Sequence, residues 1–476
     1  MNLALEPAVA LLAKLRAREV SSRELTELYL ERIERLNPLL NAVVTVDAER
    51  ALARADELDK RSEPAGPLHG LPITIKDQFE TAGVRTTCGA EAYGDYIPKT
   101  NAAAVQRLVD AGAIVLGKTN LPALAGDWQT FNNLFGTTNN PFDLARTPGG
   151  SSGGSAAVIA AGLSALELGG DIGGSVRNPS AWCGVFGHKS SWGIVPYRGT
   201  LPAPPGTHSR TDVAAPGPIA RSADDLELAL GVLAAPDEWD ATAWRLELPP
   251  PRHERISDHR VAVWIEDDRY PIAADLRDAF AEVASSLAAA GARVERTRPD
   301  LDLDEIRSLR QELVYPILAL GLGDEAFAEE VERERSLAPE ADTYEARRTR
   351  GAVQTHRAWL RTNERRAQVR AEWARFFEDW DVCLVPPTPT VAIPHDHGEQ
   401  ASRTIDVDGE QRPYSELGGW ISLAGVAYLP STVAPVGRSR DGLPIGIEVV
   451  GPYLEDRTPI HIARAIGSYE APPLAD

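Results

Sequence analysis

The sequence predicts an α/β protein in which helices cover the faces of a β-sheet. Short β-branched and apolar runs alternate with segments of helical periodicity along the chain, and this alternation is typical of an α/β sheet. The chain has 476 residues, of which 43% are hydrophobic and 25% are charged. That balance is usual for a globular protein, and the length is sufficient to bury a large core.

The predicted elements follow this alternation from the N-terminus onward. A capping box at Ser21 and Glu24 marks the start of one early helix. The first half is predicted to hold two or three helices within 7–60, a strand at 71–77, a helix at 101–111, a strand at 113–117 and a buried helix at 156–162. After a linker candidate at 249–251, the second half is predicted to hold a strand at 259–264, a helix at 272–292, a solvated helical layer over 303–380, strands at 382–385 and 445–450, and a helix at 456–467.

The charge balance and the cysteines exclude several classes of protein. The 49 Lys and Arg residues are outnumbered by 69 Asp and Glu residues, and the net charge of −20 argues against a nucleic-acid or membrane-surface partner. No stretch approaches the ~18 consecutive apolar residues of a membrane span, and the first residues lack the pattern of a signal peptide. Cys88, Cys183 and Cys383 are too scattered for a disulfide framework or a metal site. We therefore expect a cytoplasmic protein.

Lys76 is the first candidate for chemistry, because the chain has only six lysines and this one ends an apolar, strand-like run. Apolar surroundings lower the pKa of a lysine, so that its neutral amine can act as a base. The neighbouring Asp77 would favour the charged ammonium if the two side chains were close. A surface lysine whose amine reaches solvent is the alternative that the residues leave open.

Two stretches rich in glycine and serine provide further candidates. The first, Pro-Gly-Gly-Ser-Ser-Gly-Gly-Ser at 148–155, suits a flexible loop or an anion cradle, but it lacks the lysine of a P-loop. In the second, at 169–177, Ser175 directly follows two glycines. This pattern suits a nucleophile on a tight turn whose backbone N–H groups stabilise an oxyanion. A purely structural turn explains the same residues equally well.

Histidine and cysteine offer weaker candidates. The sequence contains neither a Gly-x-Ser-x-Gly elbow nor a His-Glu-x-x-His motif. His395-Asp396-His397 could bind a metal, but its spacing on a polar loop favours a solvated segment, so no metal site is predicted. Cys183 is expected to be a buried, inert thiol. A cysteine hydrolase that acts through Cys183 is nevertheless an alternative.

The combined motifs resemble those of the amidase signature family. Ser151 follows Lys76 by 75 residues and Ser175 follows Ser151 by 24, and both spacings are similar to those of the family. The flanking motifs that also match are Asn-Asn-Pro at 139–141, Pro-Ser-Ala-Trp-Cys-Gly at 179–184, Asp-Val-Cys-Leu-Val-Pro-Pro-Thr at 381–388 and Gly-Leu-Pro-Ile-Gly at 442–446. The resemblance covers nearly the whole chain and is strongest to bacterial members of the aryl-amidase or urethanase type.

This resemblance implies one large α/β domain over 1–476, with a mixed β-sheet sandwiched by helices. The catalytic core would span about 60–230, the helical layer about 270–380, and the C-terminal strands and helix 381–470. The family's Ser–Ser–Lys triad would make Ser175 the nucleophile and Lys76 the base, with Ser151 between them. The peptide bond from Gly150 to Ser151 would be cis.

The resemblance also implies roles for the residues around the triad. The backbone N–H groups that would form the oxyanion hole belong to Ile172, Gly173, Gly174 and Ser175. Ser152 and Asp171 would support the loop, while Arg177 would orient it or meet an acyl substrate. The residues expected to line the acyl pocket are Ala125, Gly126 and Trp128. Because two of these are small and the third is an aromatic wall, we expect a roomy pocket that suits aryl amides, anilides or aryl carbamates.

The implied activity is that of a serine hydrolase that cleaves C–N bonds of amides through an acyl-enzyme, and the same steps would cleave carbamates (urethanes) and esters. It would need no cofactor, act on a small-molecule amide or carbamate, and be a monomer or a homodimer. One alternative is the glutaminase-type A subunit of a tRNA-dependent amidotransferase. The acidic composition and an unusual His-Lys-Ser-Ser-Trp-Gly at 188–193 weigh against that alternative. A non-catalytic binding module is the other alternative, and the intact triad positions weigh against it.

Overall fold

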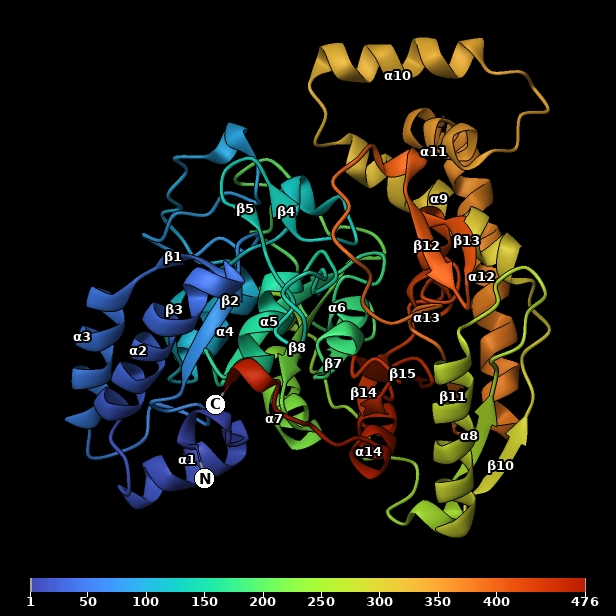
Figure 1. Ribbon diagram of the computed structural model, residues 1–476. Coiled ribbons are helices and arrows are strands. Elements are labelled where there is room, and N and C mark those ends of the chain that lie inside the picture. The colour runs from blue at the N-terminus through green and yellow to red at the C-terminus, as the bar shows by residue number, and fades with distance from the viewer. Residues whose placement is uncertain (1, 476) are drawn as a thin grey trace.

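A mixed β-sheet runs through the whole molecule. The computed structural model describes residues 2–475, and its main sheet has 11 strands in the order β1-β3-β2-β6-β8-β7-β14-β15-β11-β9-β10. Parallel pairing joins β3, β2 and β6 on one side and β11, β9 and β10 on the other, with antiparallel strands between them. Helices flank this sheet (Figure 1), so the predicted α/β class is confirmed.

The elements have the following bounds. The strands of the main sheet are β1 (Val43–Val46), β2 (Pro72–Lys76), β3 (Ile114–Thr119), β6 (Leu166–Asp171), β7 (Phe186–Lys189), β8 (Ala215–Ala220), β9 (Arg260–Val263), β10 (Arg293–Arg296), β11 (Val382–Val385), β14 (Ser431–Arg438) and β15 (Pro444–Val450). Two small sheets pair β4 (Phe131–Asn132) with β5 (Gly136–Thr137) and β12 (Thr404–Val407) with β13 (Glu410–Pro413).

The helices are α1 (Ala8–Ala17), α2 (Ser22–Leu40), α3 (Ala48–Asp59), α4 (Ala103–Asp110), α5 (Gly153–Ala160), α6 (Arg177–Trp182), α7 (Ala223–Leu233), α8 (Ala274–Ala289), α9 (Leu303–Ala319), α10 (Asp324–Ser336), α11 (Tyr344–Val353), α12 (His356–Asp379), α13 (Ser422–Val426) and α14 (Arg457–Ile466). Between residues 2 and 475, none of the helices combines the length and apolar character that a membrane span requires.

The elements predicted in the first half are present. Ser21 caps α2 by accepting a hydrogen bond from the Glu24 N–H, and the Glu24 side chain accepts one from the Ser21 N–H, which confirms the capping box. The region 7–60 contains α1, α2 and α3, and the following predicted elements correspond to β2, α4 and β3. The predicted buried helix is α5, which begins earlier than expected, at Gly153, and ends at Ala160.

Several central strands were not predicted because they are rich in glycine and proline. β6 continues through Gly169 and Gly170 as far as Asp171, and the turn that leads to Ser175 follows it. A glycine is required where neighbouring atoms approach closely, as at Gly170, where a Cβ would lie 2.7 Å from the side-chain nitrogen of Gln78. In β8, for example, a Cβ on Gly217 would lie 1.9 Å from the carbonyl oxygen of His188 on the neighbouring β7.

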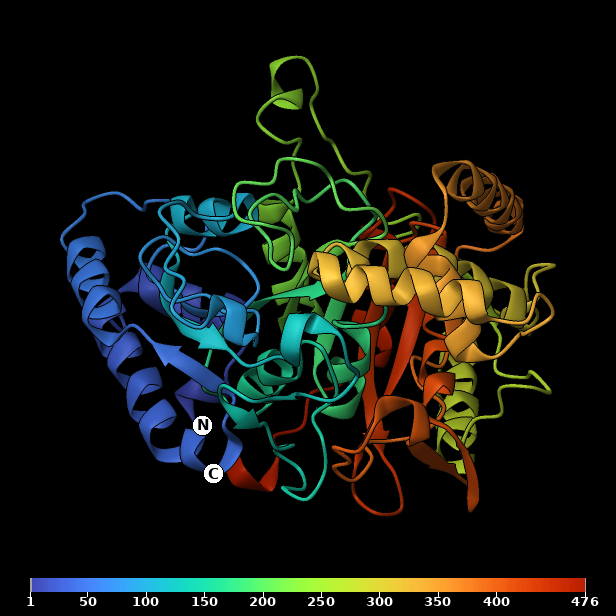
Figure 2. The same ribbon diagram turned by 90° about the horizontal axis from the view of Figure 1, so that it is seen from above.

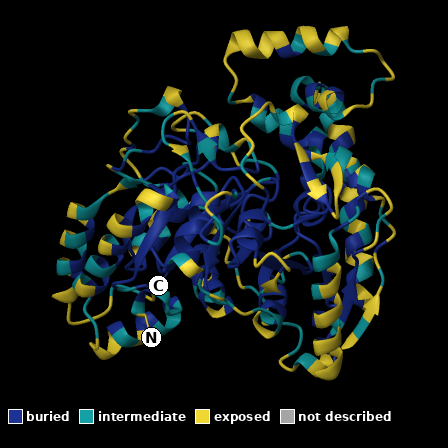
Figure 3. Cartoon of the chain, in the orientation of Figure 1, coloured by how far each residue is buried: buried dark blue, intermediate teal, exposed yellow. Residues whose placement is uncertain are grey.

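The helical region 303–380 is solvated only in part. It contains α9, α10, α11 and α12, as predicted. Figure 1 shows α10 projecting from the rest of the molecule, and Figure 3 shows that most of it is exposed. In contrast, α9 buries Ile306, Leu309 and Leu313, and it packs against α11, α12 and α13. The prediction of a solvated layer is therefore wrong for α9, whose apolar stripe faces other helices.

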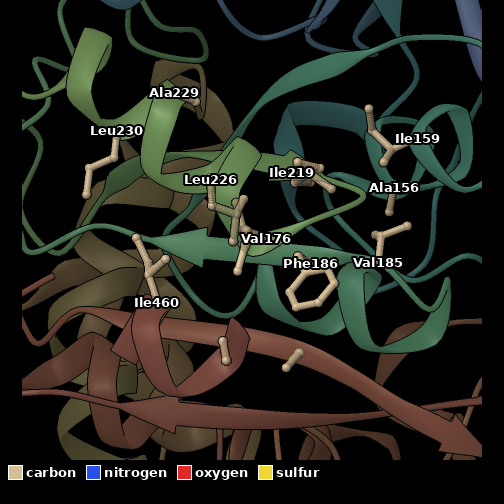
Figure 4. Packing of buried hydrophobic residues seen from close by; sticks show 14 of the residues in the cluster. Ala156, Ile159, Val176, Val185, Phe186, Ile219, Leu226, Ala229, Leu230 and Ile460 are labelled. Carbon is tan, nitrogen blue, oxygen red and sulfur yellow. The ribbon is translucent and has the colours of Figure 1, made fainter. Parts of the chain in front are cut away.

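The core lies between the sheet and the helices around it. Figure 4 shows buried side chains from several strands and helices packed together, among them Ile159 of α5, Phe186 of β7, Ile219 of β8, Leu230 of α7 and Ile460 of α14. The linker candidate at 249–251 leads into β9, which belongs to the same sheet. Seen from above, a loop around residue 240 extends away from this core (Figure 2).

The parallel pairing of β2 with β6 brings the candidate residues together. In this pair Ile75 lies opposite Leu168, so the carboxyl ends of both strands reach the same edge of the sheet. Lys76 is the last residue of β2, and Asp171 is the last residue of β6. Ligands of open α/β sheets bind at the carboxyl ends of the strands. The loop at 172–175 is therefore placed beside Lys76.

The close packing of α5 against the loop after β3 yields a prediction. A Cβ on Gly154 would lie 2.5 and 2.6 Å from the backbone N and O of Asn120, whereas nothing lies within 4 Å of a Cβ on Gly231 in α7. We expect Gly154→Ala to lower the free energy of unfolding by about 1–3 kcal/mol through overpacking. Gly231→Ala, the matched control, should raise it by up to about 1 kcal/mol. Urea denaturation measures both, and equal values for the two variants would contradict the packing argument.

Candidate active site

The amine of Lys76 is buried at the end of β2 and contacts a serine. Its Nζ donates a hydrogen bond of 2.7 Å to the Oγ of Ser151 and one of 3.3 Å to the carbonyl oxygen of Gly170. The side chain has no exposed surface. The alternative of a lysine that reaches solvent is therefore wrong.

Burial lowers the pKa of Lys76 from its usual value near 10.5 to about 7, and more distant Cys88, Asp171 and Glu167 oppose part of that shift. The adjacent Asp77 does not hold the amine in its charged form, because successive side chains of a strand point to opposite faces. Its carboxylate instead accepts a 3.0 Å hydrogen bond from the Thr87 N–H and lies 3.9 Å from the Nζ of Lys118. At neutral pH a substantial fraction of Lys76 is thus uncharged.

Ser151 lies just before α5, and the peptide bond from Gly150 to Ser151 is cis. The Gly150 N–H donates to the Oδ1 of Asn178 at 2.9 Å. The Ser152 N–H donates to the carbonyl oxygen of Ser175 at 3.0 Å. These two contacts tie the first glycine-rich stretch to the second. Ser151 and Ser175 are therefore held on adjoining backbone segments.

Ser175 follows the turn at the end of β6, and 5% of its surface remains exposed. The backbone N–H groups of Ile172, Gly173 and Ser175 donate no hydrogen bond to any acceptor between residues 2 and 475. The N–H of Gly174 differs, because it donates to the Oδ1 of Asp171 at 2.8 Å. Of the four donors expected for an oxyanion hole, three are therefore available and Gly174 is already used by a carboxylate.

Asp171 and Arg177 form a buried ion pair beneath this loop. The Nε and one Nη of Arg177 each lie 3.0 Å from the Asp171 carboxylate, and the other Nη lies 2.8 Å from Oε1 of Glu448 and 2.6 Å from the carbonyl oxygen of Ile421. Burial would raise the pKa of Asp171, but the Arg177 guanidinium and the hydrogen bonds outweigh it and hold that pKa well below its usual range. Arg177 is completely buried and its donors are taken up by Asp171, Glu448 and Ile421, which favours the first of its two expected roles, orienting the loop.

The three residues expected to line the acyl pocket have different surroundings in the structure. Trp128 is buried, and its indole Nε1 donates to the Gly173 carbonyl oxygen at 3.0 Å, which places it against the turn. Ala125 packs instead on a small cluster that contains Cys88 and Leu201. Gly126 is exposed.

The other sequence candidates lie in structural settings. The Cys183 thiol is buried, which raises its pKa, and it contacts the carbonyl oxygen of Pro148 at 3.4 Å. A thiol whose pKa is raised is a poor nucleophile, so this environment disfavours a cysteine hydrolase. Within residues 2–475, no group of three or more His, Cys, Asp or Glu side chains is arranged to hold a metal ion, and this includes the surroundings of His395 and His397.

Comparison with known proteins identifies the family. The sequence pattern described as Amidase matches residues 24–459. The chain belongs to the amidase family. It is similar to the A subunit of the Glutamyl-tRNA(Gln) amidotransferase of Thermosynechococcus vestitus, with 33% identity over 94% of this chain and 94% of that protein. Amidase-family proteins are hydrolases of C–N bonds, and this is the activity class of the chain.

Solved structures show the same fold. The A subunit of the Glutamyl-tRNA(Gln) amidotransferase of Thermotoga maritima superposes with a TM-score of 0.80 at 28% identity, and the match covers 100% of this amidase and 99% of that chain. A bacterial aryl acylamidase of the amidase signature family superposes with a TM-score of 0.79 at 24% identity, covering 97% of this chain and 95% of that one. At that identity the second comparison shows the fold alone.

Some residues at the site gave no sequence signal. Glu448 comes from β15 and Asn178 from α6, and both contact the glycine-rich stretches through single side-chain oxygens. Arg310 lies on α9, in a region whose many arginines and glutamates predicted a solvated surface. Its guanidinium stacks over the ring of Trp128 at 5.1 Å from the ring centre. Only the packing of α9 distinguishes this arginine from its neighbours.

The buried network of Arg177 predicts a large effect on stability. Arg177→Met leaves the carboxylates of Asp171 and Glu448 buried without their cation, so we expect a loss of about 3–5 kcal/mol in the free energy of unfolding. The matched control is Arg296→Met, which removes an ion pair of 2.7 Å with Glu266 in which both side chains are more than half exposed. That change should cost about 0–1 kcal/mol. Chemical denaturation measures both, and a loss below about 1 kcal/mol for Arg177→Met would contradict the assignment.

Proposed function

We propose that this amidase is a serine hydrolase that uses Ser175 as nucleophile, Ser151 as proton relay and Lys76 as base. The observation that carries the proposal is the 2.7 Å contact between the Lys76 Nζ and the Ser151 Oγ in a site that lowers the pKa of the amine to about 7. A base with a pKa near the working pH combines a useful neutral fraction with a useful proton affinity. Lys76 meets that condition without any histidine.

The first half of the reaction forms an acyl-enzyme. Neutral Lys76 takes the proton of Ser151, Ser151 takes the proton of Ser175, and the Ser175 oxygen attacks the substrate carbonyl carbon. The carbonyl oxygen becomes an oxyanion, which accepts hydrogen bonds from the free N–H groups of Ile172, Gly173 and Ser175. The proton then returns by the same relay to the leaving nitrogen, the C–N bond breaks, and a neutral amine departs.

The second half restores the enzyme. Water loses a proton to the relay and attacks the ester carbonyl of the acyl-enzyme, and the proton returns to Ser175 as the acid leaves. The same steps cleave an ester, or a carbamate whose acyl group carries an alkoxy oxygen. Lys76 ends each half-reaction in its neutral form, so no external base is consumed.

The proposed substrates are aryl amides and anilides, together with aryl carbamates. They are supported by a cavity of about 330 Å³ on one side of Trp128, lined also by Tyr344 and Tyr414. None of the proposed triad residues lines this cavity, and Trp128 connects it to the site through its hydrogen bond to the Gly173 carbonyl oxygen. A cavity of this size with aromatic walls accommodates a substituted ring. We further propose that the protein acts as a monomer or homodimer, without a cofactor or nucleic acid.

A second candidate is the glutaminase subunit of a tRNA-dependent amidotransferase, which the 33% identity with such subunits favours. Such a subunit works together with partner subunits, whereas the proposed hydrolase acts alone. The purified chain, assayed by itself on a chromogenic anilide and on glutamine, separates the two. Turnover of the anilide supports the hydrolase, and an inert chain supports the amidotransferase.

The proposed triad predicts the effect of three variants. Ser175→Ala and Lys76→Ala should each lower kcat by at least ~10³-fold, because members of one catalytic unit act together. Cys183→Ala, the control, should keep wild-type kcat. Mass spectrometry should detect an adduct of phenylmethylsulfonyl fluoride on Ser175 in the wild-type protein. Loss of activity in Cys183→Ala, with activity retained in Ser175→Ala, would contradict the assignment.

The pKa of Lys76 predicts the pH dependence. The base is active only in its neutral form, so kcat/KM should rise with pH through about 7 and level off above it. Below that pH it should fall by about tenfold per unit, as expected for a single essential base. A series of assays from about pH 5 to 9 on an uncharged anilide measures this. A profile that is flat across that range would contradict the role of Lys76.

A further inference from the structure

Arg310 is a buried cation without a partner. Only 8% of its surface is exposed, and its Nε is fully buried with no hydrogen bond. Across residues 2–475, no carboxylate lies within 4.0 Å of its guanidinium and no acceptor takes a hydrogen bond from it, and of its three nitrogens only Nε is fully shielded from solvent. A buried charge is costly unless it is paired, so this arrangement is incomplete as it stands.

The other buried arginines of the described chain show what is missing. Each donates hydrogen bonds to carbonyl oxygens or carboxylates: Arg32 to Gly162, Arg177 to Asp171, Arg221 to Ser164, Arg366 to Asp212 and Arg403 to Asp127. The fold thus supplies acceptors wherever else it buries a guanidinium. At Arg310 an acceptor from outside the chain would complete the pattern.

The unpaired guanidinium lies against the turn that carries the proposed oxyanion hole. A Cβ on Gly173 would lie 2.5 Å from one Nη of Arg310, and a Cβ on Gly418 would lie 3.2 Å from the other. On a third side the guanidinium stacks on Trp128, whose indole donates to the Gly173 carbonyl oxygen. Arg310 therefore contacts the turn two residues before Ser175, on the side where Trp128 lies.

We propose that Arg310 binds a carboxylate on the acyl portion of the substrate, so that the natural substrate is an amide whose acyl group is anionic. This inference rests on the proposed function, because the proposed reaction places the substrate carbonyl at the Gly173 turn. The acyl group of the substrate is then the part that lies on the Arg310 side of that turn. A guanidinium presents a planar fork of N–H donors that matches a carboxylate in geometry and charge. Stacking on Trp128 holds the fork in place but leaves its N–H groups free.

The test compares pairs of substrates that differ only in charge. The acidic members are the half-anilides of malonic, succinic and glutaric acid, which vary the distance from the scissile carbonyl to the carboxylate. Each neutral partner carries a primary carboxamide in place of the carboxylate. The wild-type protein should favour at least one half-anilide over its neutral partner by about 100-fold or more in kcat/KM. The half-anilide pairs the buried charge of Arg310, whereas the neutral partner leaves that charge unpaired.

Arg310→Gln should abolish this preference. We expect kcat/KM for the preferred half-anilide to fall by at least about 100-fold, mainly through KM, while the neutral partner changes by less than about threefold. Arg310→Lys should recover part of the preference, because the positive charge is retained. The matched control is Arg365→Gln on α12, where the arginine already donates to the Glu312 carboxylate at 3.0 and 3.1 Å, and it should leave the preference intact.

Two measurements keep the inference separate from folding and from the proposed chemistry. Arg310→Gln should melt at or above the wild-type temperature, since it removes an unpaired charge. Calorimetry should detect binding of the preferred half-anilide to the single variant Ser175→Ala. The double variant, which carries Arg310→Gln as well, should not bind it, and this result does not depend on whether Ser175 is the nucleophile. Absence of any charge preference, or an equal loss on charged and neutral substrates in Arg310→Gln, would overturn the carboxylate site.

Discussion

The hydrogen bond between the Lys76 amine and the Ser151 hydroxyl is the interaction on which the rest of the site depends. A lysine amine removed from water loses the solvation that favours its charged form, so burial lowers its pKa to about 7. The amine still needs hydrogen-bond acceptors, and Ser151 and the Gly170 carbonyl oxygen provide them. The parallel pairing of β2 with β6 holds these groups at one edge of the sheet.

Three buried cations near this edge differ according to the partners that the fold gives them. Arg177 faces two carboxylates, which outweigh its burial and raise the pKa of its guanidinium further. Lys76 has only neutral acceptors in contact, and burial prevails. Arg310 has no acceptor at all within the described chain, which is why we assign it to a ligand. Burial removes all three cations from water, and their partners decide the outcome. Arg177 forms a structural ion pair, Lys76 becomes the proposed base and Arg310 the proposed binding group.

Contiguous motifs made the centre of the site predictable from the sequence. Lys76, Ser151 and Ser175 each belong to a short, recognisable stretch, and the structure brings all three stretches to the end of β2 and β6. Roles that depend on which hydrogen bond a group makes were not predictable. The N–H of Gly174 looks as available as its neighbours in the sequence, but Asp171 accepts from it. Likewise, Gly170 in β6 and Gly217 in β8 weaken the sequence signal of a strand, although the Gln78 side chain and the His188 backbone leave no room for a Cβ at these positions.

By itself, the sequence determined the α/β class, the excess of acidic over basic residues and the residue types available for chemistry. It could do so because periodicity, charge and spacing are properties of the chain itself. The tertiary structure alone decided which of those residues are buried and what they contact. Arg177 and Arg310 both have polar or charged neighbours in the sequence. In the structure, Arg177 contacts carboxylates from two strands, whereas Arg310 contacts an indole ring and a glycine turn. Desolvation and pairing depend on neighbours that are distant in the chain, so they arise only when the strands and helices are packed together.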